Sequence, residues 1–314
     1  MKFVTEKAKI VESLQNAAAI AERRQTIPIL ANLRLKIIDG KLEVTATDLE
    51  IQIKTFSDLL EIKEEGETTV SARKMSELCR SLPDDENVEF SLDNGKLSVS
   101  SRNFNADFAT ISSDDFPEIE INEEQRPISI DSAKFKRLLT KTSFSMASQD
   151  VRYYLNGMLL EIGAGKINGV ATDGHRLAFS SVEAGIIDLE TRNILPRKAV
   201  LELAKLLSSN NESIELLIGA SYVDIRTENL RFCSKLIDGK YPDYDKVFPS
   251  GDSFPLEVSK ELLQSALTRA SVLSNEKYRG VRFELTKNKL KLTANNPEQE
   301  SAEEELDVVY SGSE

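Results

Sequence analysis

The chain is poor in the residues on which metal and nucleophilic chemistry most often depend. Its 314 residues include one histidine, His175, two cysteines, Cys79 and Cys233, and no tryptophan. A single histidine excludes a zinc site built from clustered histidines, and two isolated cysteines form no CxxC metal or redox motif. We therefore expect no metal, no cofactor and no catalytic residues, and two reduced thiols in a cytoplasmic protein.

Long apolar runs are also missing. The N-terminal stretch "MKFVTEKAKIVES" has no continuous apolar segment, so we expect no signal peptide. No uncharged apolar stretch approaches the ~20 residues that a membrane-spanning helix needs. With 40% apolar and 29% charged residues, the composition is that of an ordinary globular protein. A length of 314 residues is long for one domain and suits two or three.

What the sequence does contain is a repeat. Ala46-Thr47-Asp48 recurs as Ala171-Thr172-Asp173, and Phe116-Pro117 recurs as Tyr241-Pro242, both pairs 125 residues apart. A third copy begins near residue 256 and reaches only the middle of the unit, because residue 314 corresponds to about residue 190 of the second copy. The repeat predicts units at 1–126, 127–253 and 254–314, the last being a first half only.

Each repeat also looks doubled inside. Apolar residues alternate on both sides of Asp39-Gly40 and again on both sides of Asn94-Gly95, which is a strong signal for β-hairpins. Helical periodicity precedes the second hairpin at 71–82 and recurs at 196–207. The half-unit is therefore a strand, a helix and a meander of strands. This pattern predicts an α+β fold in which antiparallel sheets carry a few packed helices.

Charge is distributed unevenly along the chain. The net charge of −12 argues, taken alone, against a nucleic-acid partner. However, "SAKFKRLLTK" at 132–141 carries four basic residues and no acid, and the expected helices at 71–82 and 196–207 are also net basic. A basic face on one helix is usually only a solvated face. Its recurrence at equivalent positions of a repeat favours a surface that attracts phosphates without reading bases.

Five motifs carry a resemblance to a known family. "VATDGHRLA", "QDVRYYLNGML", "YPDYDKV", "LSNEKYRGVR" and "TANNPEQE" resemble the bacterial DNA sliding clamp, the beta subunit of DNA polymerase III, and the similarity runs from Met1 to Glu314. The resemblance implies repeated clamp domains with sheets outside and helices lining an inner face, assembled as a head-to-tail homodimer ring. It departs from the family in one respect, because the family continues through a complete third domain.

The resemblance also implies a function. A sliding clamp encircles double-stranded DNA without sequence preference, confers processivity on the replicative DNA polymerase, and docks the clamp loader and other proteins that carry a clamp-binding motif. It is an accessory subunit and not an enzyme. Weak, salt-sensitive phosphate contacts suit a ring that must slide.

Three groups of site residues follow from the same resemblance. The DNA-binding group is Arg24, Arg73, Arg137, Gln149, Tyr153, Tyr154, Arg197 and Lys198. The pocket for partner peptides is Leu155, Thr172, Gly174, His175, Arg176, Leu177, Pro242, Lys246, Val247 and Tyr278. The dimer interface is Lys74, Leu78 and Leu82 of one protomer facing Val272, Leu273, Glu298, Glu300, Glu303 and Glu304 of the other.

Two alternative hypotheses remain at this stage. Asp173 and His175 would form a hydrolase or nuclease site if a nucleophile or metal partner were present, but no GxSxG motif occurs. Alternatively, the shortened chain is a clamp-like monomer or open arc that binds partners without encircling DNA.

Overall fold

The computed structural model describes residues 1–21, 27–119, 127–185, 189–208, 210, 212–249 and 254–312. The chain forms two compact units, Met1–Pro242 and Asp243–Glu314, and each is described by itself. Within these residues, no helix is both long enough and apolar enough to cross a membrane.

The first repeat follows the predicted half-unit twice. A strand, a helix and three strands are followed by the same series, with a short additional strand β5 between them. The elements are β1 (Lys2–Glu6), α1 (Lys7–Ile20), η1 (Pro28–Ala31), β2 (Asn32–Ile38), β3 (Lys41–Thr47), β4 (Ile51–Asp58), β5 (Glu61–Glu64), β6 (Glu67–Ser71), α2 (Ala72–Ser81), β7 (Asn87–Asp93), β8 (Lys96–Ser101) and β9 (Phe104–Ala109).

The second repeat has the same order and contains three short 3-10 helices. Its elements are β10 (Ile128–Asp131), α3 (Ser132–Thr142), η2 (Ser143–Ser145), η3 (Tyr153–Leu155), β11 (Gly157–Gly163), β12 (Lys166–Thr172), β13 (Leu177–Glu183), β14 (Thr191–Pro196), α4 (Arg197–Leu206), β15 (Ser213–Ile218), β16 (Tyr222–Arg226), β17 (Leu230–Lys235) and η4 (Tyr244–Val247), the last of which lies beyond Pro242 in the second unit. The first residue of α3 follows Asp131, whose carboxylate accepts a hydrogen bond from the Lys134 amide at 2.8 Å and caps the helix.

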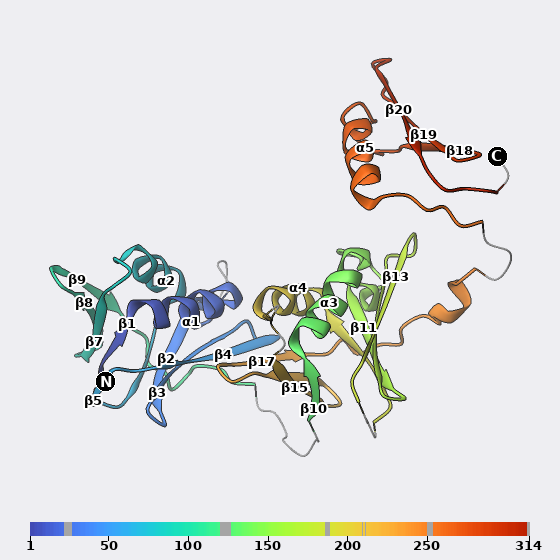
Figure 1. The fold of residues 1–314 in the computed structure, drawn as a ribbon. Helices are drawn as coiled ribbons and strands as arrows, with labels where there is room; N and C mark the ends of the chain where they lie inside the picture. Colours follow the sequence, from blue (N-terminus) through green and yellow to red (C-terminus); the bar gives the residue numbers. More distant parts are fainter. Residues whose placement is uncertain are drawn as a thin grey trace. The chain divides into compact units, whose positions relative to one another are not determined.

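The two repeats are joined through one sheet. Strand β17 of the second repeat pairs antiparallel with β4 of the first, with Cys233 opposite Gln52. The result is an eight-stranded sheet in the order β10-β15-β16-β17-β4-β3-β2-β6, which extends below α1 and below α4 in the view of Figure 1. A five-stranded sheet, β5-β1-β7-β8-β9, and a four-stranded sheet, β13-β12-β11-β14, complete the unit. All pairings in these sheets are antiparallel, as the sequence predicts.

The two expected hairpins are confirmed by their backbone geometry. Asp39 and Gly40 have φ of 49° and 76°, and Asn94 and Gly95 have φ of 47° and 74°. Two consecutive residues with positive φ match the type I′ turn, which fits the twist of antiparallel strands. The turns join β2 to β3 and β7 to β8.

The helices bury apolar faces against the sheets. Helix α1 packs on β3 and β4 and against α2, and α3 packs on β12 and β13 and against α4. Ile10 and Leu14 of α1 are fully buried, and the Phe3 and Phe90 rings stack at 4.7 Å in the same core. Burying one such side chain stabilises the fold by roughly 1.5–3 kcal/mol, so the amphipathic helices are held mainly by this packing.

The second compact unit repeats the half-unit once more. It contains α5 (Lys260–Val272) and a three-stranded sheet of β18 (Arg282–Thr286), β19 (Lys289–Asn295) and β20 (Ser301–Asp307). The Ser259 hydroxyl caps α5 by accepting a hydrogen bond from the Leu262 amide at 3.4 Å. Ala266, Leu290 and Leu292 form the centre of its core.

Candidate DNA-binding and partner-binding surfaces

The segment from Gln149 to Tyr154 presents the side chains expected to meet DNA. Tyr153 is exposed and Tyr154 is half-buried, and their rings make an edge-to-face contact at 5.8 Å. Gln149 has a φ of 59°, so the chain turns sharply before the two tyrosines. Beside the tyrosines, the Arg152 guanidinium chelates the Asp150 carboxylate through bonds of 3.0 and 2.8 Å.

The predicted helix cations divide into two classes. Arg137 of α3 is exposed, and Arg73 of α2 is exposed and pairs with Glu77 one turn later at 2.8 Å. Such an exposed i,i+4 pair is weak and leaves the arginine able to exchange its partner. Both side chains can therefore meet a polyanion. Arg24 lies outside the described residues.

The other two helix cations are engaged within the unit. Arg197 donates a hydrogen bond to the Met146 carbonyl at 3.0 Å, and Lys198 lies 2.5 Å from the Asp48 carboxylate, a residue of the first repeat. Both cations thus have a partner within the unit, and their contact with DNA stays a prediction. Asp48 was not predicted, although it is the repeat counterpart of Asp173.

The turn from Thr172 to Arg176 is built around the carboxylate of Asp173. This carboxylate accepts hydrogen bonds from the amides of His175 and Arg176 at 2.9 and 3.0 Å and from Arg176 Nε at 3.1 Å. These bonds hold the pKa of Asp173 below its usual value, the His175 amide being the largest cause. Gly174 has a φ of 88°, a backbone conformation that glycine adopts without steric cost.

Asp173 is thus a turn-forming residue and His175 is exposed. Among the described residues, no group of three or more histidine, cysteine, aspartate or glutamate side chains is arranged to hold a metal ion. The described residues therefore give the hydrolase hypothesis for Asp173 and His175 no metal partner.

The apolar residues expected in the pocket differ in exposure. Leu155 is 2% exposed, Leu177 is half-buried at the start of β13, and Pro242 is exposed. The Tyr241 hydroxyl accepts a hydrogen bond from the Thr172 amide at 3.1 Å, and burial raises the pKa of Tyr241 to about 12. A buried apolar floor with a few fixed polar groups is typical of a ligand site.

Phe144 was missed by sequence reasoning. Its exposed ring lies 5.6 Å from the Arg176 guanidinium, and its carbonyl accepts a hydrogen bond from Arg176 at 2.7 Å. Only tertiary contact brings it beside the turn. The remaining predicted pocket residues belong to the second compact unit, where Lys246, Val247 and Tyr278 are all exposed.

The expected interface residues of α2 differ in exposure. Lys74 is exposed and Leu78 is half-buried. Leu82 is only 7% exposed and belongs to the core of its own unit, where its carbonyl accepts a hydrogen bond from Lys7 Nζ. Leu82 follows the last residue of α2, so the chain turns inward there. Its side chain is therefore corrected from an interface residue to a core residue.

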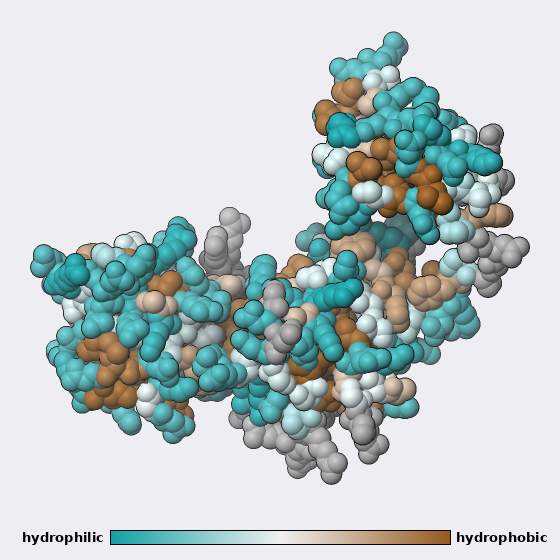
Figure 2. Space-filling view, in the orientation of Figure 1, coloured by the Kyte–Doolittle hydropathy of each residue, from teal (hydrophilic) through white to brown (hydrophobic). Residues whose placement is uncertain are grey.

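The second unit carries the acidic side of the expected interface. Val272 is 75% exposed at the end of α5, followed by the half-buried Leu273. Glu303 pairs with Lys291 at 2.9 Å, and Glu304 pairs with Arg269. Glu298 and Glu300 are exposed. On the face of this unit that is visible in Figure 2, hydrophobic residues (brown) lie among hydrophilic ones (teal).

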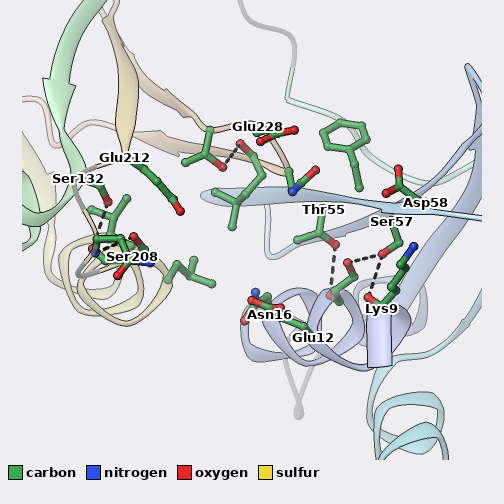
Figure 3. Close-up of a pocket in the computed structure, with 18 of the residues that line it drawn as sticks. Lys9, Glu12, Asn16, Thr55, Ser57, Asp58, Ser132, Ser208, Glu212 and Glu228 are labelled. Carbon is green, nitrogen blue, oxygen red and sulfur yellow. Dashed lines mark hydrogen bonds between the residues drawn. The ribbon is translucent and has the colours of Figure 1, made fainter. Parts of the chain in front are cut away.

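A polar cleft of about 720 Å³ lies between the two repeats of residues 1–242. Figure 3 shows Lys9, Glu12 and Asn16 of α1 on one side and residues near the end of α4 on the other. Its charged lining residues are one lysine and four acids, which are Lys9, Glu12, Asp58, Glu212 and Glu228. None of the predicted site residues lines this cleft, and its acidic lining would repel phosphate.

The fold of this chain superposes on solved structures of known proteins. A crystal structure of a sliding clamp (DNA polymerase III subunit beta) from Pseudomonas aeruginosa bound to griselimycin superposes with a TM-score of 0.94 and 42% identity, covering 99% of this chain and 85% of that one. The beta subunit of DNA polymerase III from Caulobacter crescentus superposes with a TM-score of 0.89 and 32% identity, covering 100% of this chain and 86% of that one.

Sequence relatives give the same answer. The beta sliding clamps of Pseudomonas putida and Escherichia coli K12 are each 42% identical to this chain over 315 and 314 residues, which is 100% of this chain and 86% of theirs. Family models of the DNA polymerase III beta subunit match residues 1–120 (N-terminal domain), 129–243 (central domain) and 245–314 (C-terminal domain). The chain therefore belongs to the DNA polymerase III beta subunit family, the bacterial beta sliding clamps.

Proposed function

We propose that this chain acts as a DNA sliding clamp, a ring-forming homodimer that encircles duplex DNA and confers processivity on the replicative polymerase. The observation that carries the proposal is the 42% identity to beta sliding clamps along the whole chain. The protein is an accessory subunit of the polymerase and not an enzyme. We propose that it acts in the cytoplasm, on the bacterial chromosome.

The DNA contacts are proposed to come from the described residues of the predicted group. Arg73, Arg137, Gln149 and Tyr153 are exposed, and Tyr154 is half-buried. Arginines on helices supply phosphate contacts without sequence information, and tyrosines supply stacking or hydrogen bonds. Contacts of this kind are weakened by salt, so topology rather than affinity must keep the clamp on DNA. Arg197 and Lys198 belong to the same proposed group, and each also has a partner within the unit.

The partner-peptide pocket is proposed around the Asp173 turn. Leu155 and Leu177 supply the apolar floor, and Thr172, Gly174, His175, Arg176 and Pro242 surround it. Lys246, Val247 and Tyr278 are assigned to the same site by resemblance. Its ligands would be the clamp-binding segments of the polymerase, the clamp loader and other replication and repair proteins.

The dimer contact is proposed between Lys74 and Leu78 of one protomer and Val272, Leu273 and the acids at 298–304 of the other. Complementary charge would fix the head-to-tail direction more than it adds affinity. The three domains are proposed at 1–126, 127–253 and 254–314.

Encirclement is tested with loaded clamps on DNA of two topologies. On nicked circular DNA at high salt, the protein is expected to stay bound, and after linearisation it is expected to slide off. Equal loss from both substrates would count against a closed ring. Light scattering at several concentrations gives the mass, expected at twice 35.0 kDa for the homodimer. A mass near one chain at every concentration would favour the open arc.

The pocket is tested with griselimycin, which the clamp of Pseudomonas aeruginosa binds. We expect saturable binding to this chain, weakened by Leu177→Asp and unaffected by Leu92→Asp, a half-buried leucine of β7 in the other repeat. Binding that is equally strong in both variants would place griselimycin elsewhere.

A further inference from the structure

Arg152 connects two surfaces that are separate in the sequence. On one side it belongs to the segment 149–154, which carries Tyr153. That segment is closed by Asn156, whose side chain accepts a hydrogen bond from the Asp150 amide at 2.9 Å and donates one to the Asp150 carbonyl at 2.8 Å. The Arg152 amide also donates to the Asp150 carboxylate at 2.8 Å. Arg152 is thus fixed to its own segment through three bonds to one carboxylate.

On its other side Arg152 reaches the turn of the proposed pocket. Its Nη2 donates to the Asp173 carbonyl at 3.3 Å. A Cβ placed on Gly174 would lie 3.2 Å from both terminal nitrogens of the guanidinium, so the planar group lies directly against the turn. From there the contacts continue through the Asp173 carboxylate to Arg176 and the Phe144 carbonyl.

The chemistry of this link requires an arginine. A guanidinium has five donors in a rigid fork, so one side chain can chelate a carboxylate and still donate to a carbonyl. The Arg152 side chain is 47% exposed and the Asp150 side chain 22% exposed, so a phosphate arriving at Tyr153 could compete for the guanidinium. The Arg152 bonds also hold the pKa of Asp150 at about 2, which keeps the carboxylate charged near neutral pH.

We propose that Arg152 is a positioning residue that holds the Asp173–Gly174 turn of the partner pocket against the DNA-facing segment, so that a duplex at Tyr153 alters the pocket. The inference rests on the proposed function, since both surfaces belong to it, and it adds a regulation of one by the other. Such coupling is reciprocal, and it travels through a contiguous chain of bonds.

The first test measures griselimycin affinity in the full chain. Arg152→Gln is expected to weaken binding by roughly 5-fold or more, the lower end of typical coupling between sites. Arg152→Lys is expected to behave like Arg152→Gln, because an ammonium lacks the fork. Arg192→Gln is the matched control, since Arg192 is a half-exposed arginine of β14 that pairs with Glu161 at 3.1 Å. Wild-type affinity in either Arg152 variant would overturn the proposal.

The second test uses the only histidine of the chain as a reporter. His175 lies on the turn, and because it is the single histidine of the untagged protein, its ring NMR resonances need no assignment. Adding a short duplex DNA is expected to shift them in the wild type and in Arg192→Gln, and to leave them unchanged in Arg152→Gln. An equal shift in Arg152→Gln would refute the link. Unchanged amide spectra elsewhere show that the variant is folded. A wild type that binds neither probe would overturn the proposed function itself, and the inference with it.

Discussion

Asp48→Asn is expected to loosen the junction between the two repeats of residues 1–242. The Asp48 Oδ2 atom lies 2.5 Å from Lys198 Nζ, and Oδ1 accepts hydrogen bonds from the amides of Glu50 and Ile51 at 2.9 and 2.6 Å. Asparagine keeps a carbonyl oxygen for the two amides and replaces Oδ2 with an uncharged NH2 group, which cannot accept a hydrogen bond from Lys198. The substitution therefore isolates the ion pair from the turn.

The magnitude follows from the exposure of the two partners. The Asp48 side chain is 5% exposed and that of Lys198 is 42% exposed. Hydrogen bonds to charged groups contribute about 1.5–3 kcal/mol when buried, whereas exposed ion pairs contribute roughly 0–1 kcal/mol. A pair that is buried on one side only should fall between these values, at about 1–2 kcal/mol. This corresponds to roughly 5- to 30-fold in an opening equilibrium.

Hydrogen exchange at the junction measures this loss. The Lys235 amide donates to the Glu50 carbonyl at 2.8 Å, and the Phe56 amide donates to the Asn229 carbonyl at 3.0 Å, so both amides report on the joint between β4 and β17. We expect the Lys235 amide to exchange roughly 5- to 30-fold faster in Asp48→Asn, as opening becomes easier.

The control and the double-mutant cycle decide the cause. Asp58→Asn removes a 65% exposed carboxylate from the other end of β4, which lies 3.6 Å from Lys41, and it should change exchange little. Adding Lys198→Gln to Asp48→Asn should cost little more than Asp48→Asn alone, because the pair is already broken. Additive effects of the two substitutions, or wild-type exchange in Asp48→Asn, would refute the reasoning.

Three further outcomes are expected. Leu49→Gly should stabilise the first repeat by about 0.5–1 kcal/mol in chemical denaturation, because Leu49 has a φ of 74° where the second repeat has Gly174. A loss of stability would show that the contacts of the Leu49 side chain outweigh the strain of its backbone. Gly157→Ala should destabilise the second repeat by about 1–3 kcal/mol, since a Cβ there meets the Leu195 carbonyl oxygen, and an unchanged unfolding midpoint would contradict the close packing. Burial raises the pKa values of Cys79 and Cys233 to about 12, so both thiols should resist iodoacetamide at pH 8 until the protein is unfolded. Mass spectrometry measures the labelling, and rapid labelling of the native chain would exclude their burial.

Much of the fold could be predicted because its signals are local. The Asp39-Gly40 turn needs two residues that tolerate positive φ, and aspartate followed by glycine meets this requirement by residue type alone. Helix α2 buries Met75 and Cys79, four residues apart, as the helical period requires. The same reasoning places Gly174 in a turn with positive φ. Family resemblance then supplied the site residues that periodicity could not.

The sequence could not predict the surroundings of residues whose neighbours come from distant parts of the chain. Lys198 was expected to contact DNA, and its ion pair with Asp48, 150 residues away in sequence, was not predicted. Leu82 continues the apolar period of α2, yet the helix ends one residue earlier and the side chain turns into the core. Even the pairing of Arg152 with Asp150, only two residues away, could not be predicted, because sequence spacing does not say which rotamer a side chain adopts.

The sequence by itself determined the repeating unit, the antiparallel hairpins and the helices, because each depends on the period or the turn residues of one short segment. Only the tertiary structure decided that β4 and β17 merge two repeats into one sheet, which cations are already paired, and that Arg152 touches the Asp173 turn. The physical reason is that these contacts join segments far apart in the chain. Their partners are selected by the packing of whole layers rather than by any local preference.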